Sequence, residues 1–393
     1  MEEKERLHDR INLIHPLVRE VYISADNVIT PLGFTTEENA GAMLEDRAGI
    51  RLVEDETLAP EPFHASLLDK KLLQERFSFA DDPKKFTRFE QMAICSVRDA
   101  ISRTKTDLSG PGTIFILSTT KGNVELLETD PGDDRLFLWK TAHLLGRYFN
   151  FRNEPLIISD ACISGLQAII TGVRLIKAGL YDHAVINGTD LVSEFIVSGF
   201  NSFKSLSNGP CRPFDKTRDG LSLGEGSGTI ILSSDPGTSE KPMILAINGF
   251  STNDANHISG PSRTGEGLFL AINRVLKRSP AALDFISAHG TATLYNDEME
   301  SIAITRNGLQ HVPVNSFKGY WGHTLGAAGV IESIMGIYSI RNGILFNTKG
   351  FGEPGVSNPL NIISRSERGP INNCLKIASG FGGCNAAVLF QKK

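Results

Sequence analysis

The stretch SDACISG (residues 159–165) stands where an apolar run, residues 155–158, gives way to a segment with helical spacing, residues 166–177. This pattern predicts a strand, a tight turn and a helix. Cys162 in the turn has two interpretations. It could be a buried thiol that packs as a small hydrophobic side chain. It could also be a nucleophile, because unpaired N–H groups and the helix dipole at a helix start favour the thiolate.

Strand and helix patterns alternate on both sides of this turn. We expect strands at residues 21–24, 113–117, 156–158, 184–190, 228–234, 243–247 and 285–288, with two more around GFGG (residues 380–383). We expect helices at residues 37–44, 86–101, 166–177 and 267–276. Between the first two of these helices, residues 45–83 are polar and predict a loop-like segment. This order predicts an α/β layered fold with a largely parallel, buried sheet.

The segment DPGTSEKP (residues 235–242) is rich in turn formers and charge, which predicts a boundary. We therefore expect an N-terminal extension at residues 1–20, a first half at 21–235 and a second half at 236–393. Both halves alternate strand and helix, but the residues themselves show no repeat.

Composition narrows the class of protein. The 393 residues are 40% hydrophobic and 22% charged, enough for a large core or two packed halves. A net charge of -5 argues against a nucleic-acid-coating protein. The five cysteines form no CxxC pair, so we expect reduced thiols and no metal. Neither a signal peptide nor a membrane-spanning apolar run is visible, which favours a cytoplasmic protein.

Three further motifs place reactive or flexible groups at strand ends. His289 lies in SAHGTAT (residues 287–293), and His323 lies in KGYWGHTLGAAG (residues 318–329). The glycines of ASGFGGCN (residues 378–385) allow backbone N–H groups to approach a ligand closely. Each motif alone has a structural explanation, as a satisfied buried histidine or a simple turn. Together with Cys162 they could converge at one edge of a sheet.

In this order, the cysteine turn, HGTAT, KGYWGHTLGAAG and GFGGCN resemble the condensing enzymes of the thiolase superfamily, and among them the elongating β-ketoacyl-acyl-carrier-protein synthases. The block CRPFDKTRDGLSLGEGSG (residues 211–228) is similar to theirs as well. The resemblance covers nearly the whole chain from Val21. It implies a thiolase-like fold of two similar α/β halves packed as α-β-α-β-α layers.

The resemblance also implies an acyltransferase reaction, the decarboxylative Claisen condensation of malonyl carrier protein with an acyl group held on Cys162. His289 and His323 would donate hydrogen bonds to the malonyl thioester oxygen as carbon dioxide leaves. The backbone N–H groups of Cys162 and Phe381 would form the oxyanion hole. Lys318 and Glu332 match positioning residues, although an ordinary buried ion pair would explain them too.

Substrate binding follows from the same resemblance. Thr291 and Thr293 would bind the pantetheine arm, Phe381 would gate the cysteine, and Phe200 would be a wall of the acyl pocket or else a core residue. Because acyl carrier proteins are acidic, exposed bases near the entrance should help docking. The candidates are Lys204, Lys84, Lys85 and Arg88.

No permanently bound cofactor is expected, since the phosphopantetheine arm arrives on the carrier protein. The resemblance implies a two-fold dimer, either of identical chains or with a sister ketosynthase-like subunit. We expect AVINGTD (residues 184–190) at its interface. Nucleic acid is not expected as a partner.

Some residues depart from the family pattern. Asp160 stands before the Ala-Cys pair, where it could raise the thiol pKa or could cap backbone N–H groups. Ser379 replaces a phenylalanine common in fatty-acid enzymes, and Phe203, Lys204 and Tyr295 are also unusual. These changes surround the acyl pocket and its entrance. They favour specialised lipid, polyene or polyketide-like synthesis over primary fatty-acid elongation.

Two other functions were compared with this one. A chain-length-factor-type subunit, which shapes the pocket of a catalytic sister, would lack the nucleophile, whereas Cys162, His289 and His323 are all present. A cysteine hydrolase would leave HGTAT and GFGGCN unexplained. The sequence therefore favours a catalytic ketosynthase.

Overall fold

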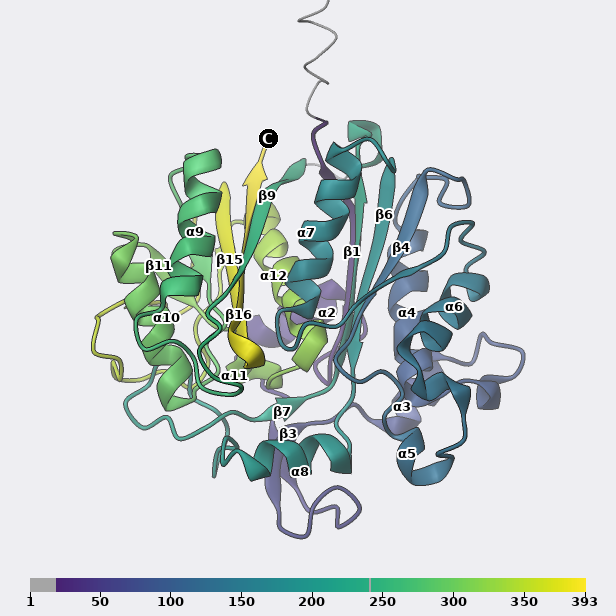
Figure 1. The fold of residues 1–393 in the computed structure, drawn as a ribbon, viewed down its shortest axis with the longest axis horizontal. Coiled ribbons are helices and arrows are strands. Elements are labelled where there is room, and N and C mark those ends of the chain that lie inside the picture. The colour runs from purple at the N-terminus through teal and green to yellow at the C-terminus, as the bar shows by residue number, and fades with distance from the viewer. Residues whose placement is uncertain (1–18, 240–241) are drawn as a thin grey trace, which may run out of the picture.

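The computed structural model describes residues 19–239 and 242–393, so residues 1–18 of the expected N-terminal extension lie outside the described residues. Its main sheet has the strand order β13-β11-β10-β15-β16-β9-β1-β8-β6-β4-β5 (Figure 1). The strands of the first half are β1 (Tyr22–Ile29), β4 (Thr113–Ser118), β5 (Leu156–Ile158), β6 (His183–Asp190) and β8 (Gly226–Ser233). Those of the second half are β9 (Ile244–Asn253), β10 (Phe285–Ser287), β11 (Pro313–Asn315), β13 (Asn361–Ile362), β15 (Asn373–Gly380) and β16 (Cys384–Lys392).

The two halves have the same topology. In each, the first strand pairs with the last, the last pairs with the one before it, and both pairs are antiparallel. The next two neighbours, β4 and β5 or β10 and β11, extend the sheet in parallel. The halves join where β1 meets β9, through the registered pair Tyr22–Leu245. The structure thus shows a duplicated strand topology, although the amino-acid sequences of the two halves show no repeat.

Five layers result. α7 (Ser164–Lys177) and α12 (Ala328–Asn342) lie between the strands of the two halves and pack against both (Figure 1). On the outside, α4 (Arg88–Ser102) and α6 (Leu138–Tyr148) cover the first half. On the opposite outside, α9 (Glu266–Arg278) covers the second half with α10 (Leu294–Arg306) against it. The predicted α-β-α-β-α thiolase-like fold is confirmed. The expectation of a largely parallel sheet is wrong, because five of the ten strand pairings described in the main sheet are antiparallel, namely those of the last strand of each half and the one where the halves meet.

Smaller elements complete the chain. The remaining helices are α2 (Thr36–Leu44), α3 (Lys70–Arg76), α5 (Leu126–Thr129), α8 (Glu194–Ser202) and α11 (Lys318–Trp321). Single 3-10 turns are η1 (Pro83–Lys85), η2 (Asp134–Leu136), η3 (Pro236–Thr238), η4 (Leu325–Ala327) and η5 (Phe381–Gly383). Short strands are β2 (Arg51–Val53), β3 (Phe63–Ser66), β7 (Leu223–Gly224), β12 (Ile344–Leu345) and β14 (Glu367–Arg368). Residues 45–83 are therefore not simply a loop, because they contain α3, β2 and β3. None of the helices described is long and apolar enough to cross a membrane.

Two glycines let the central helices touch at their backbones. A Cβ on Gly165 would lie 2.7 Å from the backbone nitrogen of Val330, and one on Gly329 would lie 2.3 Å from that of Leu166. Any larger residue would force the helices apart. The small residues of GAAG are thus explained by the crossing, which brings the turn before α7 next to the turn before α12.

The expected subunit interface at residues 184–190 is wrong. β6 lies inside the sheet, with β8 paired to one edge and β4 to the other. Its residues from Ala184 to Asp190 are all buried. In the described part of the chain, the strand that ends the sheet on this side is β5, which precedes the nucleophile turn rather than following its helix.

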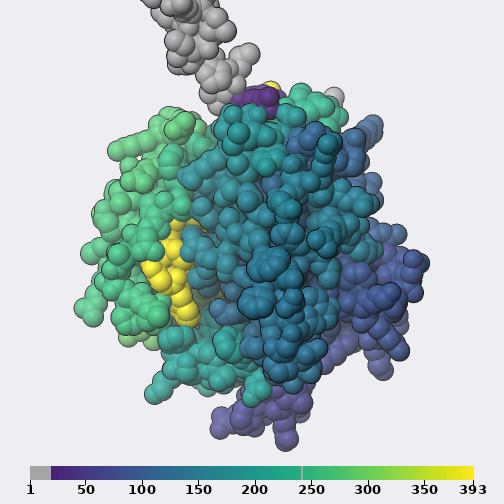
Figure 2. Space-filling view, turned by 45° about the vertical axis from the view of Figure 1, so that its right-hand side comes forward, coloured from purple at the N-terminus to yellow at the C-terminus, as the bar shows by residue number. Residues whose placement is uncertain are grey.

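Figure 2 shows how the halves meet at the surface. The C-terminal segment (yellow) reaches the surface between the second half (green) and the teal and blue parts of the first half. The functional site described next uses side chains from both halves.

Candidate active site

Cys162 lies in a sharp turn between β5 and α7. Ala161, directly before it, has a left-handed φ of 44°, which is unfavourable for a residue with a Cβ. The Ser164 hydroxyl stabilises the turn, since it accepts from the Asp160 N–H at 2.8 Å and donates to the Ala161 carbonyl at 2.6 Å. The turn leaves the thiol 7% exposed at the bottom of a pocket.

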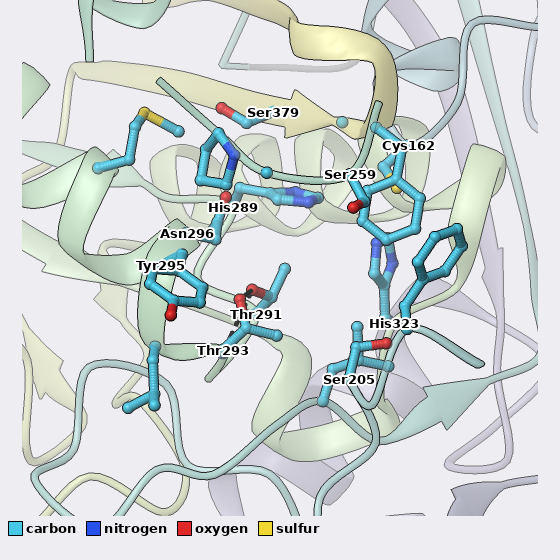
Figure 3. A pocket seen from close by; sticks show the side chains of 18 of the residues that line it. Cys162, Ser205, Ser259, His289, Thr291, Thr293, Tyr295, Asn296, His323 and Ser379 are labelled. Atoms are coloured by element: carbon cyan, nitrogen blue, oxygen red, sulfur yellow. Dashed lines mark hydrogen bonds between the residues drawn. The ribbon is translucent and has the colours of Figure 1, made fainter. Parts of the chain in front are cut away.

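Both predicted histidines converge on this thiol. The Cys162 sulfur and ring nitrogens of His289 and His323 all lie within 4.8 Å of one another. The two rings are nearly perpendicular, with centroids 5.0 Å apart. Figure 3 shows the rings extending from different elements toward Cys162. The structure thus brings together three residues that are far apart in the sequence.

Hydrogen bonds fix the proton of each imidazole. His323 Nδ1 accepts from the Leu325 N–H at 3.1 Å, and His289 Nδ1 lies 3.2 Å from the Lys318 ammonium, which can only donate. Each ring therefore carries its proton on Nε2. His323 Nε2 is buried and has no partner among the described residues. Both Nε2–H groups are available to donate to a substrate oxygen.

Both histidines are neutral at pH 7. Burial and, after it, the charge of Lys318 hold the pKa of each imidazole well below its usual value. Among the described residues, the Cys162, His289 and His323 side chains are the group close enough to hold a metal ion. Since both Nε2 atoms carry protons, we assign them to a substrate instead.

The thiol itself does not behave as its position before a helix suggests. Burial raises the pKa of Cys162 to about 11, although Lys318 and the Phe381 N–H act in the opposite direction. Burial thus opposes the thiolate that the start of helix α7 is expected to favour. The backbone N–H groups of Phe381 and of Cys162 itself lie beside the sulfur, and their role as an oxyanion hole stays a prediction.

Lys318 and Glu332 form a buried ion pair behind His289. The Lys318 ammonium donates to Glu332 Oε1 at 2.6 Å and to the His289 carbonyl at 2.6 Å, in addition to its contact with the His289 ring. Sequence reasoning missed a second lysine in this group. Lys376 donates to the other oxygen of Glu332 at 2.6 Å. A lysine within the apolar strand pattern of residues 373–380 was the available signal.

The pocket above the thiol holds about 390 Å³ and contains the predicted substrate-binding residues. Thr291 and Thr293 line it, with their hydroxyls 2.9 Å apart (Figure 3). Phe200 stacks on Phe381 with centroids 5.7 Å apart, so it is a pocket wall as well as a packing residue. Phe203 meets Phe381 edge-on at 5.2 Å. Three aromatic rings thus surround the entrance to Cys162.

The four predicted docking bases differ. Lys204 is exposed and lines the mouth of the pocket. Lys84 and Lys85 are exposed on η1 but do not line it. Arg88 is wrong as a docking base. Its guanidinium lies 2.8 Å from the carboxylate of Glu225, whose side chain is 1% exposed, so it neutralises a buried charge.

Asp160 lies beside Cys384 of the last glycine-rich loop. Its backbone carbonyl accepts from the Cys384 thiol at 3.7 Å. Burial and, after it, the charge of Asp160 raise the pKa of Cys384. The structure thus connects Asp160 to this loop, and its effect on the Cys162 thiol stays a prediction.

Sequence reasoning also missed residues that position or line the site. Asp190, at the end of β6, accepts from the N–H groups of Thr120 at 2.9 Å and Gly326 at 2.7 Å, which ties the first half to the turn of His323. Asp254, His257 and Ser259 line the pocket from the loop after β9. Their segment, NDANHIS, carried no pattern that we interpreted.

Comparison with known families agrees with this geometry. Residues 18–236 match the model of the β-ketoacyl synthase N-terminal domain, and residues 244–351 match that of the C-terminal domain. The chain belongs to the β-ketoacyl synthase family. The predicted family is thereby confirmed.

Relatives within the family come from two kinds of synthesis. The tetracenomycin polyketide synthase ketoacyl synthase alpha subunit of Streptomyces glaucescens is 34% identical over 60% of this chain and 60% of its own length. The 3-oxoacyl-[acyl-carrier-protein] synthase 2 of Synechocystis is 27% identical over 95% and 98%. The chain spans 57–60% of the length of the relatives that it matches at 32–34% identity.

A solved structure covers the whole fold. The ketosynthase ApeO from Xenorhabdus doucetiae, in complex with its chain length factor ApeC, has a TM-score of 0.79 and 26% identity, over 96% of this chain and 99% of the matched chain.

Proposed function

We propose that this chain catalyses the decarboxylative condensation of a malonyl thioester with an acyl group carried on Cys162. The observation that carries the proposal is the convergence of the Cys162 sulfur with two neutral imidazoles within 4.8 Å. The N–H groups of Cys162 and Phe381 on the sulfur support it. The family's relatives act in fatty-acid and polyketide synthesis by their names, which agrees with this chemistry.

The first step is acyl transfer. The Cys162 sulfur attacks the carbonyl of an acyl-phosphopantetheine thioester, the C–S bond to pantetheine breaks, and the thiol proton leaves with the pantetheine sulfur. The tetrahedral oxyanion lies against the two backbone N–H groups, which are oriented before charge develops. Because burial raises the pKa of the Cys162 thiol to about 11, the proton must leave the sulfur as the attack proceeds rather than before it.

The second step makes the carbon–carbon bond. The malonyl thioester oxygen accepts hydrogen bonds from Nε2–H of His289 and of His323 while the C–C bond to the carboxylate breaks and carbon dioxide leaves. The two donors stabilise the resulting enolate. Its carbon attacks the acyl-Cys162 carbonyl, the C–S bond to Cys162 breaks, and a β-ketoacyl thioester remains on the carrier.

The same pocket supports a specialised acyl substrate over primary fatty-acid elongation. Phe200, Phe203 and Phe381 surround the thiol with ring faces and edges. Ser379 lines the pocket at the position where a second phenylalanine is common in fatty-acid enzymes. Ring faces contact a flat conjugated chain favourably. We therefore propose polyene or polyketide-like chains as the substrate class.

The carrier and a second subunit are the proposed partners. An acidic carrier would reach the pocket past Lys204, and its phosphopantetheine arm would extend along Thr291 and Thr293. No resident cofactor is proposed. The second subunit would meet β5, where Leu156, Phe137 and Trp139 expose large apolar side chains. The complex of ApeO with its chain length factor supports a sister subunit as partner. Since this chain has the nucleophile and both histidines, it would be the catalytic member. Its location in the cytoplasm stays a prediction.

Loaded carriers test the proposal directly. After incubation with acyl carriers of graded length and unsaturation, intact mass spectrometry should show the acyl mass on Cys162, and a malonyl carrier should then discharge it as a β-ketoacyl carrier. Conjugated acyl groups should load faster than saturated ones of equal length. Absence of any adduct with every carrier, both alone and with a sister subunit, would show that the chain is not a ketosynthase.

Assembly is tested separately. Light scattering should show a dimer of the chain alone or with a sister subunit. A stable monomer in both cases contradicts the proposed interface at β5.

A further inference from the structure

Lys376 is a second lysine buried behind the catalytic pair of histidines. It lies on β15 and its side chain is 0% exposed. Its ammonium donates to Glu332 Oε2 at 2.6 Å, to the Ala288 carbonyl at 2.9 Å and to the Ser287 carbonyl at 3.3 Å. Burying a lysine costs several kcal/mol unless its charge and hydrogens are satisfied. An apolar residue would fill the same space without that cost, so packing alone does not explain Lys376.

The strand register directs this lysine to the segment that carries His289. Lys376 on β15 pairs with Ser287, the last residue of β10, in parallel. From there its side chain reaches the two carbonyls that directly precede His289. The position of the His289 backbone therefore depends on the Lys376 ammonium.

Glu332 connects Lys376 to the ring of the same histidine. One carboxylate oxygen accepts from Lys376 and the other from Lys318, each at 2.6 Å. Lys318 in turn lies 3.2 Å from His289 Nδ1. Without Lys376, one oxygen of Glu332 would lose its partner, and the carboxylate would be free to turn away from Lys318.

We propose that Lys376 is a positioning residue of this site, which holds Glu332 and the backbone before His289 so that Lys318 keeps the His289 proton on Nε2, facing the substrate. Its effect on turnover rests on the proposed function. Its effect on the His289 ring does not, because the contacts exist in the free protein.

The charges around His289 come from several elements. Lys318 on α11, Lys376 on β15, Glu332 on α12 and Glu300 on α10 surround it, with His323 and Cys162 on the pocket side. Glu300 accepts from the N–H groups of His289 and Gly290 at 2.7 Å each. Burial and, after it, the charge of Asp297 on the same helix raise the pKa of Glu300 to about 7. The charge of Lys376 also lowers the pKa of both imidazoles, so its removal should raise them.

The test compares wild type with Lys376→Met, whose side chain has similar length and no charge. The nine histidines are labelled with ¹³C and ¹⁵N, and His289 and His323 are assigned by His289→Asn and His323→Asn. In wild type, both rings should stay neutral, with the proton on Nε2, as the pH falls below 6. In Lys376→Met, His289 should titrate at a pH higher by about one unit, or part of it should move its proton to Nδ1.

The turnover rate is the second measurement that tests the proposal. In Lys376→Met, kcat for malonyl decarboxylation should fall by about ten- to a hundredfold with KM for the carrier unchanged, since positioning partners typically have effects of this size. Unchanged His289 titration and tautomer would overturn the proposal, whatever happens to kcat. A wild-type protein without activity on any carrier would instead defeat the proposed function, while the imidazole spectra would still decide the role of Lys376.

Arg341→Met is the matched control for losing a buried cation. Arg341 lies at the end of α12, about 13 Å along the helix from Glu332, and pairs with Asp26. The substitution Arg341→Met should lower the melting temperature without changing the pKa of His289. If Lys376→Met does not fold, the wild-type spectra suffice. A His289 ring that carries its proton on Nδ1 or titrates near pH 6.5 in wild type contradicts the proposal.

Discussion

Two turns occupy the same place in the repeated topology, and they carry different chemistry. In the first half, the turn after β5 is short and presents the Cys162 thiol and its own N–H at the start of α7. In the second half, the connection after β11 is longer, contains α11 and η4, and presents Lys318 and His323 before α12. The nucleophile and one hydrogen-bond donor, His323, thus come from equivalent turns of two similar units. The repeated fold supplies the position, and the local turn supplies the reactive group.

Removing the thiol should distinguish the roles of the two halves most clearly. Cys162→Ala should lower condensation at least about a thousandfold, because no acyl-enzyme can form. Decarboxylation of malonyl carrier should persist, since His289 and His323 do not need the sulfur to stabilise an enolate. Intact mass spectrometry and carbon dioxide release measure the two activities. An acyl adduct on the variant, or equal loss of both activities, would show that acylation and decarboxylation are not assigned to the two halves in this way.

Removing a donor from the second half should have the opposite selectivity. His289→Ala and His323→Ala should each lower decarboxylation by about a hundredfold or more, as one hydrogen bond to the developing enolate is lost. Acylation of Cys162 should continue. His311→Ala is the control, because His311 is an exposed histidine outside the pocket. Decarboxylation at the wild-type rate in either variant would refute the assigned roles.

The raised thiol pKa gives a prediction about pH. Only the thiolate is alkylated, and the pKa of Cys162 is raised to about 11, so its rate with iodoacetamide should rise about tenfold per pH unit from pH 7 toward 10. Burial raises the pKa of Cys95 and Cys374 further, to about 12, so both should react more slowly. Peptide mapping distinguishes the sites. A rate that levels off near pH 7, or a Cys162 no faster than the other two, would be the opposite result.

The contact between the two helix starts gives the smallest expected effect. Gly329→Ala should push α12 from α7 and cost about 1 to 3 kcal/mol of stability, with a several-fold loss of kcat as Cys162 and His323 separate. Gly41→Ala is the control, since a Cβ there has nothing within 4 Å in helix α2. It should be neutral or slightly stabilising. Thermal melts and initial rates measure both. Equal behaviour of the two variants would mean that the crossing does not set the geometry.

Local patterns were enough to predict much of the fold. The strand at residues 156–158 and the helix ending at Lys177 follow directly from their apolar spacing. The loop expected at residues 45–83 was wrong because β2, β3 and α3 are too short to show periodicity, and β2 and α3 are also mostly exposed. Short elements are stabilised by what they pack against, which a local pattern does not contain.

The sequence predicted the site residues whose chemical type is itself informative. It did not predict roles that depend on contacts between residues far apart in the chain. Cys162, His289 and His323 stood out in their motifs, whereas Arg88 was misread because its partner Glu225 is far along the chain. The sequence pattern suggested only the effect of the helix start on Cys162, whereas burial, which depends on the whole fold, raises the pKa of this thiol to about 11. Lys376 was missed because its meaning depends on Glu332, which only the fold places beside it.

The registered pair Tyr22–Leu245 has a consequence for how the molecule moves. Each half is a continuous ladder of hydrogen bonds, but the ladder narrows to this pair where the halves meet. Side-chain packing of α7 and α12 between the halves therefore resists bending at the seam more than the sheet does. The spacing of the reacting groups is thus a mechanical property of the central helix pair.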